Sequence, residues 1–209
     1  MKDVDQHWPG RLTEQTALRD RLVDCYAASH RGYHDLRHLA EVLANLDDLL
    51  TQPEAEGADR DAVMLAAWFH DAVYDGRPDD EERSAALAET TLAACDVPRT
   101  LVAEVARLVR LTREHRPAPN DLAGRLLCDA DLAILASGPE RYDEYVHDVR
   151  REYAHLDDAT FRAGRAQVLR SLLAKPTLFH TLSAQQSWEH RARANVEREL
   201  AGLTTGNGT

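Results

Sequence analysis

The stretch from Val63 to Tyr74 reads VMLAAWFHDAVY and decides the fold class. It is apolar nearly all round, which is the pattern of a helix buried at the centre of a helical bundle. His70 and Asp71 nevertheless stand inside this run. Burying an unpaired carboxylate costs several kcal/mol even after relaxation, so a partner for Asp71 is expected close by.

A second apolar stretch carries two further acids. Residues 126–135 read LLCDADLAIL and place Asp129 and Asp131 among apolar neighbours. An arginine or a helix N-terminus would be an ordinary structural partner, because aspartate is a good helix cap. A divalent metal is the functional alternative, since imidazole and carboxylate together suit Zn, Fe, Mn or Ni.

The surrounding sequence is also helical in pattern. Apolar residues recur three and four apart from 36 to 50, and again over 160–173 and 185–200, whereas β-branched alternation is almost absent. Proline and glycine cluster in short polar loops near residues 53–57, 76–78 and 117–120. We therefore predict a single all-α domain over residues 1–209, a bundle of eight or nine helices, with 202–209 as a disordered tail.

Composition restricts the function classes. The chain has 209 residues, with 25 Lys and Arg against 36 Asp and Glu, so its formal net charge is -11. That balance argues against a partner that is a nucleic-acid polymer. No apolar run approaches the ~20 residues that span a bilayer, which predicts no membrane partner. The N-terminus lacks a signal-peptide pattern, and Cys25, Cys95 and Cys128 show no CxxC spacing, so a reducing, cytoplasmic location is expected.

Histidines strengthen the metal interpretation. His34 and His38 are four apart in YHDLRH and would share one face of a helix. His38, His70, Asp71 and either Asp129 or Asp131 would supply two nitrogens and two oxygens from three helices, a plausible open metal site. We interpret the remaining histidines as surface or core residues, with the exception of His115, which ends a helical pattern just before Pro117. They are His7, His30, His147, His155, His180 and His190.

At these residues the chain resembles the HD-domain superfamily of metal-dependent phosphohydrolases. The matching pattern is a histidine at His38, the consecutive pair His70 and Asp71, and a distant aspartate at Asp131. An uncharacterised subgroup of predicted HD phosphohydrolases is closer still, on the segments YHDLRH, WFHDAVYDG, DDEERSA, VRREYAHL, AGRAQVL and ARANVEREL. The resemblance runs from about residue 32 to residue 200. Asp80 departs from it, because asparagine is expected there.

The resemblance implies an HD-type helical bundle with a divalent ion, Mn, Ni, Co, Mg, Zn or Fe, held by His38, His70, Asp71 and Asp131. Asp129 and Asp131 lie about 200° apart round a helix, so the two side chains do not easily coordinate the same ion. We favour Asp131, because the last aspartate of the family follows an alanine and precedes an apolar stretch. Asp129 would then accept a hydrogen bond that orients a ligand imidazole.

The implied reaction is attack of a metal-activated water on the phosphorus of a nucleotide or another small phosphate ester. Asp71 would ligate the ion and orient the water, and Glu82 would move the proton, with Glu81 and Asp75 as alternatives. An acidic first turn of a helix explains these acids equally well. We expect substrate contacts from His34, Arg37, His115 and Arg150, while Arg113, Arg165 and Arg193 are further cations in matching segments.

Two other functions stay open at this stage. A di-iron oxygenase built on the same fold would need His34 or His115 as additional ligands. A non-catalytic nucleotide-binding module would use the ion only to hold its structure. Neither the physiological substrate nor the number of ions follows from the sequence, and a homodimer is left open.

Overall fold

The computed structural model describes residues 2–205, in which helices carry the regular structure and no strand occurs. This confirms the all-α prediction. Nine α-helices in this range have ten residues or more, which agrees with the expected number. The α-helices are α1 (Lys2–Asp5), α2 (Thr16–Tyr26), α3 (Leu36–Leu50), α4 (Arg60–Phe69), α5 (Asp80–Ala94), α6 (Arg99–Leu111), α7 (Leu122–Asp131), α8 (Pro139–Glu152), α9 (Asp158–Leu173) and α10 (Leu182–Thr205), with short 3-10 segments η1 (Gly10–Leu12), η2 (Pro53–Ala55) and η3 (Leu132–Ala136).

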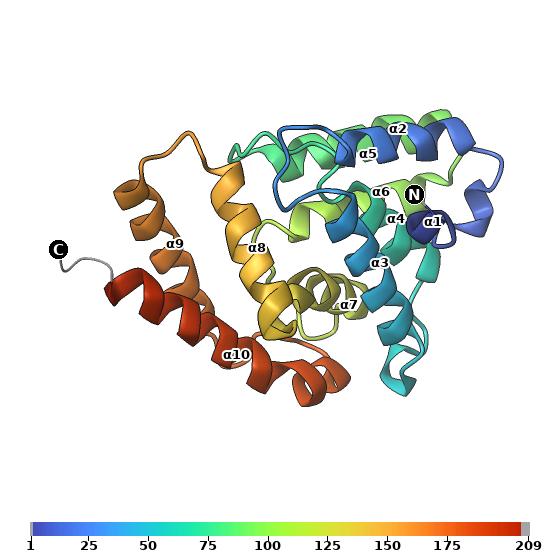
Figure 1. Cartoon of the computed structure of the whole chain (residues 1–209). Coiled ribbons are helices and arrows are strands. Elements are labelled where there is room, and N and C mark those ends of the chain that lie inside the picture. The colour runs from blue at the N-terminus through green and yellow to red at the C-terminus, as the bar shows by residue number, and fades with distance from the viewer. Residues whose placement is uncertain (1, 206–209) are drawn as a thin grey trace.

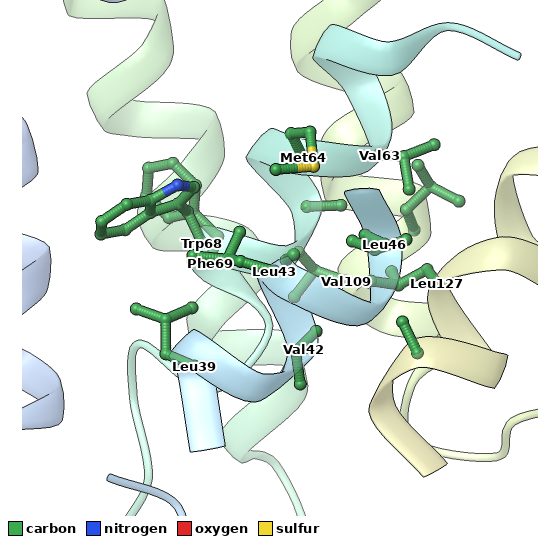
Figure 2. Close-up of a cluster of buried hydrophobic side chains, with 14 of the residues drawn as sticks. Leu39, Val42, Leu43, Leu46, Val63, Met64, Trp68, Phe69, Val109 and Leu127 are labelled. Atoms are coloured by element: carbon green, nitrogen blue, oxygen red, sulfur yellow. The ribbon is translucent and has the colours of Figure 1, made fainter. Parts of the chain in front are cut away.

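Helix α4 is the central helix of the bundle. Every residue from Ala62 to Phe69 is buried, and α3, α6 and α7 pack around it. Figure 2 shows side chains of α3 and α4 meeting in this core, joined by Val109 from α6 and Leu127 from α7. The apolar pattern of the sequence therefore placed this helix correctly.

The end of α4 differs from the prediction. The helix stops at Phe69, so His70 and Asp71 follow it in a turn instead of lying within a longer helix. Ser84 holds this turn, because its hydroxyl donates to the carbonyl of Val73 at 3.2 Å and accepts from the Val73 N–H at 3.0 Å. The two side chains meet at the end of the core, where Asp71 Oδ2 lies 3.2 Å from His70 Nε2.

The start of α3 also differs. Asp35 caps this helix by accepting hydrogen bonds from the backbone N–H groups of Arg37 and His38. His34 therefore precedes the helix, and the expected shared helical face of His34 and His38 was wrong. The two imidazole rings still lie near each other, with centroids 5.5 Å apart.

The C-terminal helices form one side of the molecule. Figure 1 shows α8, α9 and α10 together, on the opposite side of α3 and α7 from α1 and α2. Asn195 of α10 is buried and donates to the carbonyls of Leu135 and Ser137 at 2.9 and 3.0 Å, which ties α10 to η3. Helix α10 begins three residues earlier than predicted and continues to Thr205. Residues 202–205 of the expected tail are therefore helical, and 206–209 lie outside the described residues.

The described helices and the three cysteines bear on the expected absence of a membrane span and of disulfides. Within residues 2–205, no helix combines the length and apolar character that crossing a bilayer requires. Cys128 is buried, Cys25 and Cys95 are half-buried, and all three are free thiols.

Candidate metal centre

Four predicted ligands converge where three helices end or begin. His38 lies in the first turn of α3, His70 and Asp71 follow α4, and Asp131 is the last residue of α7. The two Nε2 atoms of His38 and His70 are 3.0 Å apart. Asp71 Oδ2 lies 3.4 and 3.2 Å from them, and Asp131 Oδ1 lies 3.3 and 3.6 Å from them, respectively.

The chemistry of these donors fits a divalent ion. The ring Nδ1 of His70 is 2.7 Å from the carbonyl of Ala67 and can only donate there, so its Nε2 carries a lone pair when the ring is neutral. Ligand atoms about 2.1 Å from one ion lie roughly 3.0–3.4 Å from each other, depending on the geometry. The separations within the cluster come close to this range. His38, His70 and Asp71 form the tightest group, and they could hold a metal ion.

The electrostatics of the cluster also call for a positive charge. Burial raises the pKa of Asp71 and of Asp131, but the neighbouring imidazole of His70 outweighs it and keeps both pKa values well below the usual range. Burial lowers the pKa of His70, but the negative charges of Asp71 and Asp131 raise it well above its ordinary value. A pair of ionised carboxylates at the end of an apolar core thus needs either protonated histidines or a bound cation.

Arg31 holds the two ligand-bearing segments together. Its side chain is buried, and its guanidinium donates to the carbonyls of His34, Asp71 and Ala72 at 2.7, 2.8 and 3.1 Å. It also lies over the ring of Tyr26, 5.0 Å from the centroid. The sequence offered no signal for this role, because Arg31 looked only like part of a loop.

Glu152, at the end of α8, is a second residue that sequence reasoning missed. Its Oε1 accepts from the consecutive backbone N–H groups of Gly32, Tyr33 and His34 at 3.0, 2.9 and 2.8 Å. Its Oε2 lies 2.8 Å from His34 Nδ1. Burial raises the pKa of Glu152, but these bonds and the charge of His34 lower it overall. The available signal was its place in the segment VRREYAHL.

A cavity of about 510 Å³ opens beside the cluster. Its polar wall includes Asp71 and Asp131, together with His34, His115 and Glu81. Much of the remaining wall is apolar or aromatic and comes from η3, α8 and α9, including Leu132, Ile134, Tyr145, Val149 and Phe161. A small molecule in this cavity would therefore have a polar end at the carboxylates and an apolar surface along the C-terminal helices.

Two of the four predicted substrate contacts reach this cavity. His34 lines it and stacks on Tyr74, with ring centroids 4.0 Å apart. His115 lines it as well, and its Nε2 lies 2.7 Å from Asp131 Oδ2. His115 also has φ +48°, a left-handed conformation that is uncommon for a residue other than glycine.

The two predicted arginines do not reach it. Arg37 is exposed on α3 and pairs with Glu41 and Glu144. Arg150 donates to Asp158 and to two backbone carbonyls of the connection between α8 and α9. Both arginines are therefore engaged away from this cavity, and the structure does not bring them to the place where the predicted substrate contact would need them. Arg165 of α9 lines the cavity, but it is paired with Glu199 at 2.7 Å.

Glu82 is misplaced for the predicted proton transfer. Its side chain points away from the cavity, and its carboxylate pairs with Arg110 at the surface, 2.7 Å away. Glu81, one residue earlier, lines the cavity instead. Burial and the negative charges of Asp71 and Asp80 raise the pKa of Glu81.

Asp129 and Asp80 have structural partners. Asp129 is fully buried and accepts from the backbone N–H groups of His180 and Thr181, each at 2.7 Å, just before α10. It does not orient a ligand imidazole, so that expectation was wrong. Asp80 is buried as well and accepts from the N–H groups of Asp75 and Arg77, each at 2.8 Å. It therefore fixes the loop between the turn after α4 and α5.

No family model, curated protein or solved structure matches the chain. The identity of the site consequently depends on its residues and their geometry.

Proposed function

We propose that the chain is a metal-dependent phosphohydrolase of the HD type that acts on a nucleotide or another small phosphate ester. The observation that carries the proposal is the convergence of four side chains at one end of a cavity: the Nε2 atoms of His38 and His70 lie 3.0 Å apart, and an oxygen of Asp71 and one of Asp131 each lie 3.2–3.6 Å from both of them. The resemblance of the segments around these residues to HD phosphohydrolases agrees with it.

The metal would be held by these four side chains. When bound, it supplies a water of lowered pKa and positive charge for phosphoryl oxygens. Asp71 also lines the cavity, so its carboxylate is placed to accept a hydrogen bond from that water. A bound cation reverses the local field, so the acidic balance of the chain does not exclude a phosphate substrate.

Binding of the phosphate group is assigned to His34 and His115. Both rings line the cavity, and each is held on one nitrogen by a carboxylate, His34 by Glu152 and His115 by Asp131. The carboxylates fix the orientation of the two rings, and an imidazole N–H can donate a hydrogen bond to a phosphoryl oxygen. The histidines would thus replace the arginines that the sequence predicted for this role.

Glu81 is assigned as the proton carrier. It lines the cavity, and its pKa is raised. A larger fraction of its carboxyl group is therefore protonated at a given pH than for an exposed glutamate. A carboxyl in this state can donate to the oxygen of a leaving alcohol. Glu82 has no such access because Arg110 holds it at the surface.

The oxygenase alternative depends on whether a second ion binds. His115 faces the second oxygen of Asp131, at 2.7 Å, and is the residue best placed to join such a site. His34 is held by Glu152 on Nδ1 and has only its other nitrogen left. A single-ion site leaves the contacts of His34 with Glu152 and of His115 with Asp131 as they are, and both histidines stay available to bind substrate. We therefore prefer the hydrolase.

The test combines metal analysis with phosphate release from a panel of nucleotides and simple phosphate esters. The purified chain should bind one divalent ion and release phosphate from at least one compound. Asp71→Asn should lose both properties. Asp61→Asn is a matched control, since Asp61 lies in the first turn of α4, the helix that precedes Asp71, and pairs with Arg11 at the surface. Two irons per chain with oxygen consumption would replace the hydrolase by the oxygenase, and an inert metal-loaded protein would refute both.

A further inference from the structure

A second cavity, of about 310 Å³, lies next to the metal centre. Tyr33, Asp131 and Ile134 line both this cavity and the larger one, so these residues form the wall between them. His38 lines only the second cavity, and Arg141 of α8 closes part of it. None of the roles assigned above uses this space.

Three buried polar atoms without a hydrogen-bond partner in the described chain belong to residues that line this second cavity. They are Tyr33 Oη, Ser137 Oγ and Arg141 Nη1. Tyr33 is only 4% exposed, so its hydroxyl has no access to bulk solvent through the protein surface. Leaving a buried donor unsatisfied costs about 1–3 kcal/mol, and such groups are therefore rare without a ligand or an ordered water.

The chemistry of the three atoms defines what they would bind. Arg141 uses Nε and Nη2 on the two carboxylate oxygens of Glu41, at 2.7 and 2.8 Å, which leaves Nη1 as a donor only. The hydroxyls of Tyr33 and Ser137 can donate as well. A single ligand that satisfies all three must present several acceptor atoms, as an oxyanion does.

Arginine side chains supply positive charge at this cavity. Arg191 of α10 adds an exposed guanidinium to the wall. Both acids of the wall have partners: Glu41 is paired with Arg141, and Asp131 Oδ2 lies 2.7 Å from His115 Nε2. Arg141 Nη1 stays without a partner, and a charged donor of this kind makes its strongest hydrogen bonds to a negatively charged acceptor.

We propose that this second cavity is a binding site for a small oxyanion, such as a phosphate group, held by Tyr33, Ser137 and Arg141. The site does not need the metal, and the inference does not depend on the proposed phosphohydrolase. The ligand would be a charged hydrogen-bond acceptor that two hydroxyl groups and a guanidinium contact. Ordered water alone is the competing occupant.

Titration of inorganic phosphate into the full chain with a chelator present, followed by calorimetry, tests the inference. Tyr33→Phe and Ser137→Ala each remove one unpartnered hydroxyl and should weaken phosphate binding at least about tenfold, the loss expected when a hydrogen bond to a charged group disappears. Thr160→Ala is the matched control, because Thr160 lines only the larger cavity. It should leave the affinity unchanged.

Two outcomes would overturn the site. The first is that the wild-type chain binds no phosphate, as expected if water alone fills the cavity. Alternatively, phosphate could bind the two hydroxyl variants as tightly as the wild type, which places it elsewhere. Thermal unfolding of each variant shows whether the fold is retained, and a structure determined with phosphate would locate the ion directly. If Tyr33→Phe does not fold, Ser137→Ala decides the question alone.

Discussion

Glu152 offers the sharpest test of how the site is built. In Glu152→Ala, the N–H groups of residues 32–34 lose the single carboxylate oxygen that accepts all three. His34 Nδ1 loses its partner at 2.8 Å in the same step. The Glu152 side chain is only 3% exposed, so water does not simply replace it.

The size of the effect follows from these contacts. A buried donor without a partner costs about 1–3 kcal/mol, and three backbone donors are affected. The half-buried position of His34 lets some water enter after truncation, which places the expected loss near the lower end, at about 3–5 kcal/mol of unfolding free energy. Glu152→Gln keeps an acceptor and loses only the charge, so about 1–2 kcal/mol is expected.

Urea unfolding at neutral pH, with a chelator present, measures these differences without any contribution from a metal. Glu144→Ala serves as the control, because Glu144 lies on the same helix and pairs with Arg37 at the surface. It should change the free energy of unfolding by less than about 0.5 kcal/mol. A loss below about 1 kcal/mol in Glu152→Ala would show that this carboxylate does not hold the turn.

Three other perturbations test separate parts of the structure. His70→Ala should abolish metal binding. The wild type should gain about 2.7 kcal/mol of stability at an ion concentration of 100 Kd, which thermal melts with and without chelator detect as a shift of roughly 5–10 °C in the melting temperature. The variant should show no such shift. Gly32→Ala should lower the melting temperature, because a Cβ there would lie 2.3 Å from the carbonyl oxygen of Asp148; an unchanged melting temperature would contradict that packing. Asp121→Asn tests pH dependence: burial raises the pKa of Asp121, but Arg107 and the N–H of the helix it caps lower it overall. Its carboxylate therefore stabilises the fold at pH values above the ordinary pKa of about 4, and this stability is lost as the pH falls through the lowered pKa. The free energy of unfolding of the variant should accordingly fall less steeply in acid than that of the wild type.

The sequence predicted most of the fold because helical periodicity is a local property. The apolar run of α4 and the spacing of Leu39, Val42 and Leu46 in α3 need no distant information. The end of α4 at Phe69 was not predictable in this way. Ser84 holds the turn that follows from another helix, and such a tertiary contact leaves no periodic pattern.

The candidate site was predictable in its acids and histidines but not in their surroundings. Buried carboxylates in apolar segments stand out, which is why Asp71 and Asp131 were singled out. Neighbours in the sequence were a poor guide, since successive helical residues point about 100° apart. Glu82 therefore faces Arg110 while Glu81 faces the cavity. Glu152 lies more than a hundred residues from the turn it holds, and no local pattern connects them.

All four candidate ligands occur by residue 131, before α8 begins. Tyr145, Val149, Phe161 and Arg165, which wall the larger cavity, come from α8 and α9. The part of the chain that would perform chemistry and much of the part that would select the molecule are thus consecutive instead of interleaved. Under the proposed function, substitutions of these wall residues would change which molecule fits the larger cavity while the four candidate ligands stay in place.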